Sequence, residues 1–121
     1  MKKHVLVLLS ISLLLSFCKK NELGGSSKIS GIVAHHEKVI PYARVFIKFD
    51  AKEFPGSDTS LYDSKFSTGA DGAYSFKLYK GDYFLYGYGY DPGVPGTVVG
   101  GIHVKLRKNE SNSVNVAVTE Q

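Results

Sequence analysis

Histidine is the residue type in this chain best suited to chemistry near neutral pH, and the chain has four. His4 lies in the N-terminal segment considered below. His35 and His36 are adjacent in a polar turn, and His103 faces outward on a predicted strand. Converging histidines can hold a metal ion, but adjacent histidines in an extended chain point in opposite directions. We therefore expect three solvated surface histidines, with no metal and no cofactor.

Residues found in hydrolytic and nucleotide-binding sites are present without the spacing that such sites need. Serine, histidine and aspartate occur, but no nucleophile elbow does. No glycine-rich loop precedes a helical pattern, so nucleotide binding has no support. Asp71 and Asp82 stand beside glycines, which is typical of turns. We expect no catalytic residue, and a small hydrolase or metal-binding protein is the minor alternative.

Cys18 is the only cysteine, so it cannot form a disulfide within the chain. It ends a segment that begins with Lys2 and Lys3 and continues as an apolar run, the pattern of a secretory signal. The run is shorter than the roughly 20 apolar residues that span a bilayer. The stretch 15–18, Leu-Ser-Phe-Cys, resembles a bacterial lipobox, in which a leucine stands three residues before a cysteine that becomes lipidated. Phe17 departs from the small residue usual there.

The lipobox resemblance implies a lipoprotein signal peptide over residues 1–17 and Cys18 as the first mature residue. Cys18 would carry a diacylglyceryl thioether, and its freed amine a further acyl chain such as palmitate. Several chains together make a stable membrane anchor. Residues 18–27 then read as the lipidated cysteine and a flexible Gly/Ser-rich tether. The alternative is an ordinary signal peptide with an incidental cysteine.

The expected location is the cell envelope, and Lys19 favours the outer membrane, because an aspartate after the cysteine favours retention in the inner one. The formal charge of the whole chain is +4. Removing Lys2 and Lys3 would leave about +2, too little and too scattered for a nucleic-acid partner.

The 121 residues suffice for one domain, which we place at residues 28–121. Short apolar runs separated by turns predict seven strands, at 28–34, 42–50, 60–68, 74–78, 82–90, 97–108 and 113–119. Period-two alternation points one face of each strand inward. The inward residues outside 82–90 are Ala43, Val45, Ile47, Phe49, Tyr74, Phe76, Leu78, Ile102, Val104, Leu106, Val114, Val116 and Val118. This pattern predicts an all-β fold, a seven-stranded antiparallel Greek-key sandwich.

Leu78, Gly81 and Tyr83 form an L-x-x-G-x-Y motif that resembles the tyrosine corner of Greek-key sandwiches. In that motif the tyrosine hydroxyl bonds back to the backbone across a connection between strands. Gly81 supplies the backbone freedom that the corner needs. The alternative is an ordinary core tyrosine.

The stretch from Ser30 to Tyr90 resembles the carboxypeptidase regulatory-like domain. The matching residues are Ser30, Gly31, Val33, Pro41, Ala43, Val45, Thr68, Gly72 and Tyr74. Gly69 stands where the family has an aspartate. The resemblance covers about half of the chain and implies a transthyretin-like sandwich of the kind appended to bacterial surface and outer-membrane proteins. Hydroxyisourate hydrolases share that fold and end in Tyr-Arg-Gly-Ser, whereas this chain ends in Val-Thr-Glu-Gln.

Aromatic residues alternate along the strand at 82–90. If Tyr83 and Leu85 point inward, the outer face carries Phe84, Tyr86, Tyr88 and Tyr90. Exposed aromatic side chains on one strand predict a candidate binding face. The alternative is structural: aromatics pair across strands, and a bulge at Gly87 would turn Tyr88 and Tyr90 into the core.

These expectations combine into a lipid-anchored cell-envelope module without catalytic activity that binds protein or glycan. Its partners would be the membrane, through the lipid anchor, and an envelope protein or glycan. The alternative is a structural accessory subunit of an envelope complex.

Overall fold

The computed structural model describes residues 19–121. The predicted signal peptide and the lipid attachment predicted at Cys18 lie outside the described residues. Within residues 19–121, no helix has the length and apolar character needed to cross a membrane. The regular elements of the described chain are all β strands apart from one short 3-10 turn, η1 (Thr59–Leu61).

Ten strands follow one another along the described chain, where the sequence predicted seven. The predicted turn after residue 34 holds one extra strand at residues 38–39, and the single strand predicted at 113–119 is replaced by three short strands at 111–113, 116–117 and 119–120. Of the strand predicted at 60–68, only residues 64–67 are a strand, and residues 59–61 form the 3-10 turn. The elements are β1 (Leu23–His35), β2 (Lys38–Val39), β3 (Arg44–Phe49), η1 (Thr59–Leu61), β4 (Ser64–Ser67), β5 (Ala73–Leu78), β6 (Gly81–Asp91), β7 (Gly96–Leu106), β8 (Ser111–Ser113), β9 (Val116–Ala117) and β10 (Thr119–Glu120).

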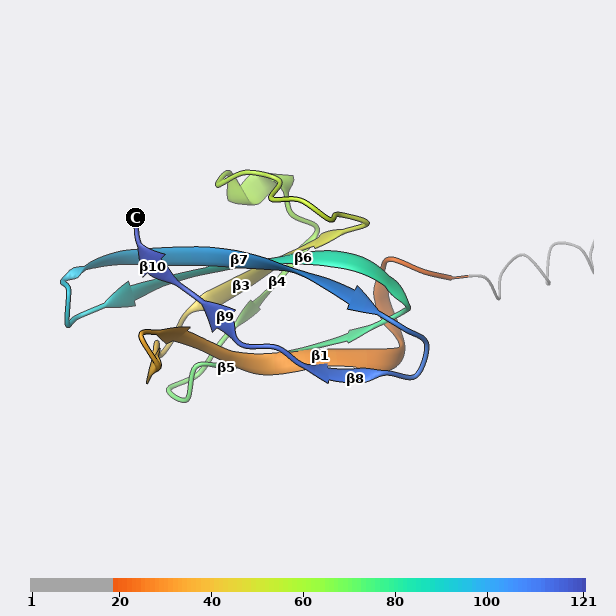
Figure 1. Cartoon of the computed structure of the whole chain (residues 1–121), viewed down its shortest axis with the longest axis horizontal. Helices are drawn as coiled ribbons and strands as arrows, with labels where there is room; N and C mark the ends of the chain where they lie inside the picture. The colour runs from red at the N-terminus through yellow and green to blue at the C-terminus, as the bar shows by residue number, and fades with distance from the viewer. Residues whose placement is uncertain (1–18) are drawn as a thin grey trace, which may run out of the picture.

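The strands form two mostly antiparallel sheets that pack face to face (Figure 1). The β6 sheet has the order β10-β7-β6-β3-β4. The β1 sheet is built around β1, which pairs antiparallel with β2 and β5 and parallel with β8 and β9. The prediction of a purely antiparallel arrangement is therefore wrong for β8 and β9, because the segment after β7 runs back beside β1 in β1's own direction.

The core between the sheets follows the predicted alternation. The inward apolar residues of β3, β5 and β6 are buried, including Val45, Phe76 and Leu85, except that Phe49 at the end of β3 is only partly buried. Ile102 was predicted to be buried, and its register opposite Leu85 does place it on the inner face. It is nevertheless 38% exposed. The reason is that β10 pairs with β7 only at residues 98 and 99, so β7 is an edge strand at Ile102.

The domain begins earlier than residue 28, so the predicted tether is shorter than residues 18–27. Leu23–Ser27 belong to β1, and both Leu23 and Ser27 pair with Leu78 across a register shift. Gly24 and Gly25 take positive φ in this irregular stretch, and a Cβ on Gly25 would lie 2.7 Å from the Tyr79 ring. Glycine is thus needed where the chain bends around Tyr79.

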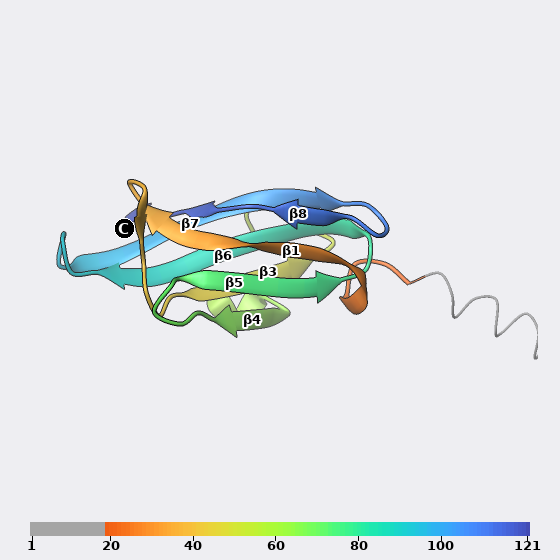
Figure 2. The same ribbon diagram turned by 90° about the horizontal axis from the view of Figure 1, so that it is seen from below.

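Tyr83 makes the hydrogen bond of a tyrosine corner where the chain crosses from β5 in one sheet to β6 in the other. Its hydroxyl donates to the carbonyl of Tyr79 at 2.6 Å and lies 3.3 Å from that of Glu22. Gly81, the first residue of β6, has φ +152°, and a Cβ there would overlap the Asn21 side chain. The corner therefore links the segment before β1 to the turn between the sheets. Figure 2 shows the start of β1 and the start of β6 at the same end of the domain.

Candidate functional site

Strand β6 carries the aromatic residues of the candidate site in unbroken alternation. Its register with β7 is continuous from Gly81 to Asp91, so no bulge occurs at Gly87. A Cβ on Gly87 would lie 2.8 Å from Val116, and one on Gly89 would lie 2.7 Å from Ile40. Neighbouring side chains fill the inner face at these glycines. The alternative in which Tyr88 and Tyr90 turn into the core is therefore wrong.

The four predicted residues of the binding face do not share one environment. Tyr88 and Tyr90 are 37% and 56% exposed, but Phe84 and Tyr86 are only 8% and 3% exposed. All four point away from the β1 sheet. The prediction that the whole stripe is accessible is thus wrong for Phe84 and Tyr86, because another part of the chain covers them.

The cover is the segment of residues 50–63, the covering loop, which lies on the outer side of the β6 sheet (Figure 1). The Phe54 ring lies 5.9 Å from that of Phe84 and 5.5 Å from that of Tyr86 between centroids. Tyr62 stacks on Tyr86 at 5.7 Å with an interplanar angle of 18°. Phe46 of β3 also contacts this cluster, at 5.9 Å from Tyr62.

Hydrogen bonds hold the covering loop in place. An Asp63 carboxylate oxygen accepts from the backbone N–H of Phe49 at 2.7 Å, and the Tyr62 hydroxyl donates to the carbonyl of Gly56 at 2.9 Å. Burial raises the pKa of Tyr62 to about 12, and it also raises the pKa of Tyr86. Both hydroxyls are protonated at neutral pH, and that of Tyr62 donates its hydrogen bond within the covering loop.

An open hollow of about 420 Å³ remains between the covering loop and β7. Gly101 helps to form it, because a Cβ there would lie 2.5 Å from Cε1 of Phe84. Tyr88 lies beside the hollow, since its register partner Val99 is one of the lining residues. The lining residues are Phe54, Ser57, Phe84, Tyr86, Val99, Gly100, Gly101 and Gln121. Apolar rings with a hydroxyl and an amide at the rim suit ligand binding.

We use the name outer aromatic face for Phe54, Phe84, Tyr86, Tyr88 and Tyr90. Phe54 is 54% exposed and was missed by the sequence argument, which treated its segment as a plain loop. Phe54, Leu61 and Tyr62 stand within an otherwise polar stretch. That composition is the signal that could have indicated packing against the sheet.

His35 is buried, which contradicts the expectation of a solvated turn residue. Its Nδ1 lies 2.8 Å from Oδ2 of Asp91, at the end of β6. Asp91 also accepts from Gly93 N at 2.8 Å and from Lys38 Nζ at 3.3 Å. The hydrogen bond from His35, followed by that from Gly93, lowers the pKa of the Asp91 carboxyl to about 2. The hydrogen bonds of Asp91, above all the one to His35, therefore link the end of β1 to the end of β6.

His36 is exposed, and its ring centroid lies 4.3 Å from that of His35. The expectation that these rings point apart is wrong because the chain is not extended here: His36 and Glu37 have φ of 49° and 67°. The described residues hold no group of three His, Cys, Asp or Glu side chains placed to bind a metal ion.

His103 faces outward as predicted and pairs with a neighbouring strand. Its Nε2 lies 2.8 Å from Oδ1 of Asp82. The hydrogen bond from His103 lowers the pKa of Asp82, and nearby Lys52 and Lys105 act in the same direction. His35 and His103 therefore belong to two separate histidine–aspartate pairs.

Comparison with known proteins finds a similar fold and gives no family or function for this chain. No family model matches the chain, and no curated protein matches it. Its structure is similar to that of a DUF3823 family protein from Parabacteroides merdae, with a TM-score of 0.51 and 21% sequence identity. The match covers 80% of this chain and 47% of the other, so this chain spans about half the length of that protein.

Proposed function

We propose that this protein is a lipid-anchored cell-envelope module that binds protein or glycan at its outer aromatic face and catalyses no reaction. The observation behind this proposal is the open hollow under Phe54, continued along β6 by Tyr88 and Tyr90. Exposed aromatic surface beside a shaped hollow is typical of binding sites. Tyrosine adds contact area and a hydroxyl while losing little conformational entropy on binding.

The hollow has the chemistry for a sugar ring or an apolar peptide side chain. A sugar ring can place its C–H face on an aromatic ring while its hydroxyls bond to polar groups such as Ser57 and Gln121. An apolar peptide side chain can fill the same space. The site lies on the outer face of a sheet and is open, so either ligand could belong to an extended polymer.

The anchor is the second part of the proposal, and the Leu-Ser-Phe-Cys stretch at 15–18 supports it. Strand β1 begins at Leu23, so few residues separate Cys18 from the domain in the sequence. A module held this close to a membrane surface would present its ligand site within the envelope, with the outer membrane favoured by Lys19.

The finer fold is also a proposal: a transthyretin-like Greek-key sandwich of the carboxypeptidase regulatory-like kind. Two face-to-face sheets and the hydrogen bond from Tyr83 to the backbone of Tyr79 support it. Members of that family are appended to surface proteins, which agrees with an envelope module, although fold does not imply function.

The test is crosslinked capture from intact membranes, together with co-sedimentation on isolated envelope polysaccharide. Phe54→Ser removes a hollow-lining ring, whereas Leu61→Ser removes an exposed residue of the same loop that does not line the hollow. We expect Phe54→Ser, and Tyr88→Ser with Tyr90→Ser, to lose the ligand while Leu61→Ser keeps it. Equal capture by all variants would reject the site. A stoichiometric protein partner that every variant retains would instead support the accessory-subunit alternative.

A further inference from the structure

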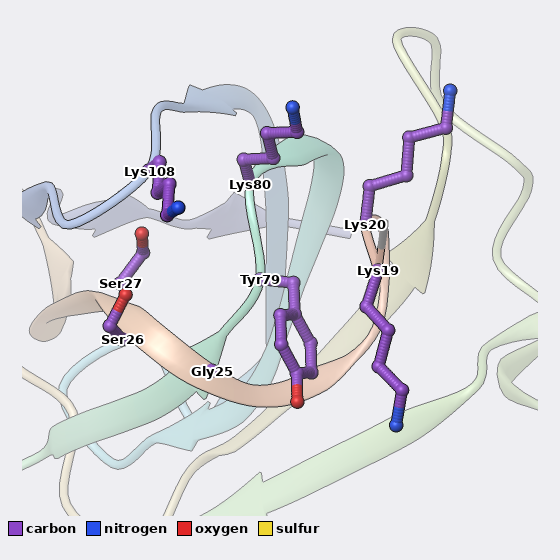
Figure 3. A pocket seen from close by; sticks show the side chains of 8 residues that line it. All are labelled: Lys19, Lys20, Gly25, Ser26, Ser27, Tyr79, Lys80 and Lys108. Carbon is purple, nitrogen blue, oxygen red and sulfur yellow. The ribbon is translucent and has the colours of Figure 1, made fainter. Parts of the chain in front are cut away.

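The end of the domain where the described chain begins carries a hollow of about 520 Å³ with a basic lining (Figure 3). Its lining residues are Lys19, Lys20, Gly25, Ser26, Ser27, Tyr79, Lys80 and Lys108. A neighbouring hollow shares Lys20, Lys80 and Lys108 and adds Lys105 and Arg107, together with Asp50 and Asp82. Six basic side chains thus gather at one end of the two sheets, and we call this surface the basic end.

Three chain segments far apart in sequence build the basic end. The N–H of Asn21 donates to the carbonyl of Lys80 at 2.9 Å, and the N–H of Tyr79 donates to Glu22 at 3.0 Å. Ser27 Oγ donates to the carbonyl of Arg107 at 2.6 Å. The N-terminal segment, the β5–β6 turn and the β7–β8 turn are therefore fixed beside one another, and each contributes lysines.

The lysines of the first hollow are not neutralised by carboxylates within the described chain. The ion pairs in residues 19–121 involve other groups: His35 and Lys38 with Asp91, Lys48 with Asp63, and His103 with Asp82. Lys19 instead lies 5.9 Å from the centre of the Tyr79 ring. Of the two acids beside the second hollow, Asp82 is already bonded to His103. The basic end is thus complementary to an anionic surface.

The position of the basic end indicates which anionic surface it meets. Lys19 directly follows Cys18, the residue proposed to carry the lipid, so the basic end adjoins the membrane if that anchor exists. Lysines close to an anionic bilayer are attracted to its headgroups, and a basic patch reinforces lipid anchoring. From this end β6 runs towards Tyr90 at the opposite end of the sheet (Figure 1).

We infer that the basic end docks on the anionic phospholipid headgroups of the membrane that holds the anchor. The two sheets then stand end-on, with the outer aromatic face directed along the side of the domain and Tyr90 farthest from the bilayer. This inference rests on the proposed lipid anchor, since the anchor brings the basic end to the membrane. The lysines of the basic end would recognise phosphate groups, and these belong to the lipid headgroups.

The test measures lysine modification on the full chain, purified from membranes in detergent and reconstituted into vesicles. One set of vesicles is phosphatidylcholine and the other includes phosphatidylglycerol. An amine-reactive acetylating reagent labels exposed lysines, and mass spectrometry reads each site. We expect Lys80 and Lys108 to be labelled several-fold less in anionic vesicles, and high salt to remove the protection. Lys38 and Lys65, away from the basic end, should be labelled equally in both.

Flotation separates failure of the anchor from failure of the docking surface. A lipid-anchored chain floats with both kinds of vesicle, and equal labelling of Lys80 and Lys108 in that case would overturn the docking inference. A chain that floats only with anionic vesicles would overturn the anchor and support the basic end. Protection in neutral vesicles by inorganic phosphate alone would assign the hollow to free phosphate and overturn the headgroup assignment.

A charge-matched pair of variants completes the test. Lys80→Gln with Lys108→Gln should bring the labelling of Lys20 in anionic vesicles close to its level in neutral vesicles. Lys38→Gln with Lys65→Gln makes the same change in net charge elsewhere and should leave the protection of Lys20 intact. If both pairs reduce protection equally, general charge and not the basic end controls docking.

Discussion

At the scale of single residues, the bonds that matter most join parts of the chain that are distant in sequence. The Tyr83 hydroxyl, bonded to the Tyr79 carbonyl, also lies 3.3 Å from the carbonyl of Glu22, and His35 bonds to Asp91. Each of these side chains has a polar group inside the domain, and a buried polar group needs a hydrogen-bond partner, which the bond supplies. Loss of either partner should therefore affect the whole domain.

Tyr83→Phe removes one buried hydroxyl and leaves the Tyr79 carbonyl without its donor. We expect the free energy of unfolding to fall by about 1–3 kcal/mol. Urea unfolding of residues 19–121 measures it, since a fragment starting at residue 28 would lack the Glu22 carbonyl and part of β1. Tyr88→Phe is the control, because Tyr88 is exposed and should tolerate the change. An unchanged midpoint for Tyr83→Phe would show that the corner bond adds no stability.

The Asp91 carboxylate should make stability depend on pH in the acid range. Its pKa in the folded chain is lowered from 3.8 to about 2, chiefly by the hydrogen bond from His35. A lowered folded-state pKa gives stability that is present above 3.8 and is lost as the pH falls towards about 2. Asp91→Asn should therefore be less stable than the wild type at pH 7, with the difference shrinking below pH 4.

Chemical denaturation at a series of pH values measures this difference. Asp71→Asn is the matched control, because Asp71 is an exposed turn residue whose side chain bonds only locally, to Ala73 N. A destabilisation by Asp91→Asn that stays constant from pH 7 to the acid limit would contradict the role of the carboxylate charge.

At the scale of elements, strands were predictable where apolar residues recur at every second position on the face that packs against the other sheet. The alternation in β3, β5 and β6 follows directly from the periodicity of their apolar residues. Irregular segments have no such periodicity. The covering loop could not be placed for this reason, even though Phe54 and Tyr62 belong to the aromatic cluster of the candidate site. The burial of His35 could not be predicted from the sequence either, because its partner Asp91 lies 56 residues away along the chain.

The covering loop makes two neighbouring tyrosines of one strand face behave differently. Tyr86→Ser removes a ring packed between Phe54, Tyr62 and Phe46, and should cost about 2–5 kcal/mol of stability, as large-to-small changes at buried sites do. Tyr88→Ser makes the same change at an exposed position and should cost under about 1 kcal/mol. Thermal or urea unfolding of the two single variants compares them directly. Equal losses would mean that the covering loop does not protect Tyr86.

At the scale of the whole molecule, the two proposed surfaces have different roles: the basic end docks on the membrane, and the outer aromatic face binds the ligand. The basic end includes Lys19, which follows Cys18 in the sequence, while the outer aromatic face extends along β6 away from this end. A rigid two-sheet domain between them would hold the ligand site at a fixed distance from the bilayer. With the proposed lipid on Cys18, the few residues between that cysteine and β1 would leave little freedom for the domain to turn away from the bilayer.

Cys18 is the residue on which this arrangement depends. Cys18→Ala removes the thiol that would receive the diacylglyceryl group, so no thioether can form and the processing that follows lipidation is blocked. We expect an unprocessed or soluble chain in place of the detergent-phase mature protein. Phase separation in a detergent solution and intact mass spectrometry measure both properties. Ser16→Ala is the control, because it keeps the cysteine. If Cys18→Ala stays in the detergent phase with the mass change of the substitution alone, the lipid lies elsewhere and the membrane-facing orientation of the basic end loses its basis.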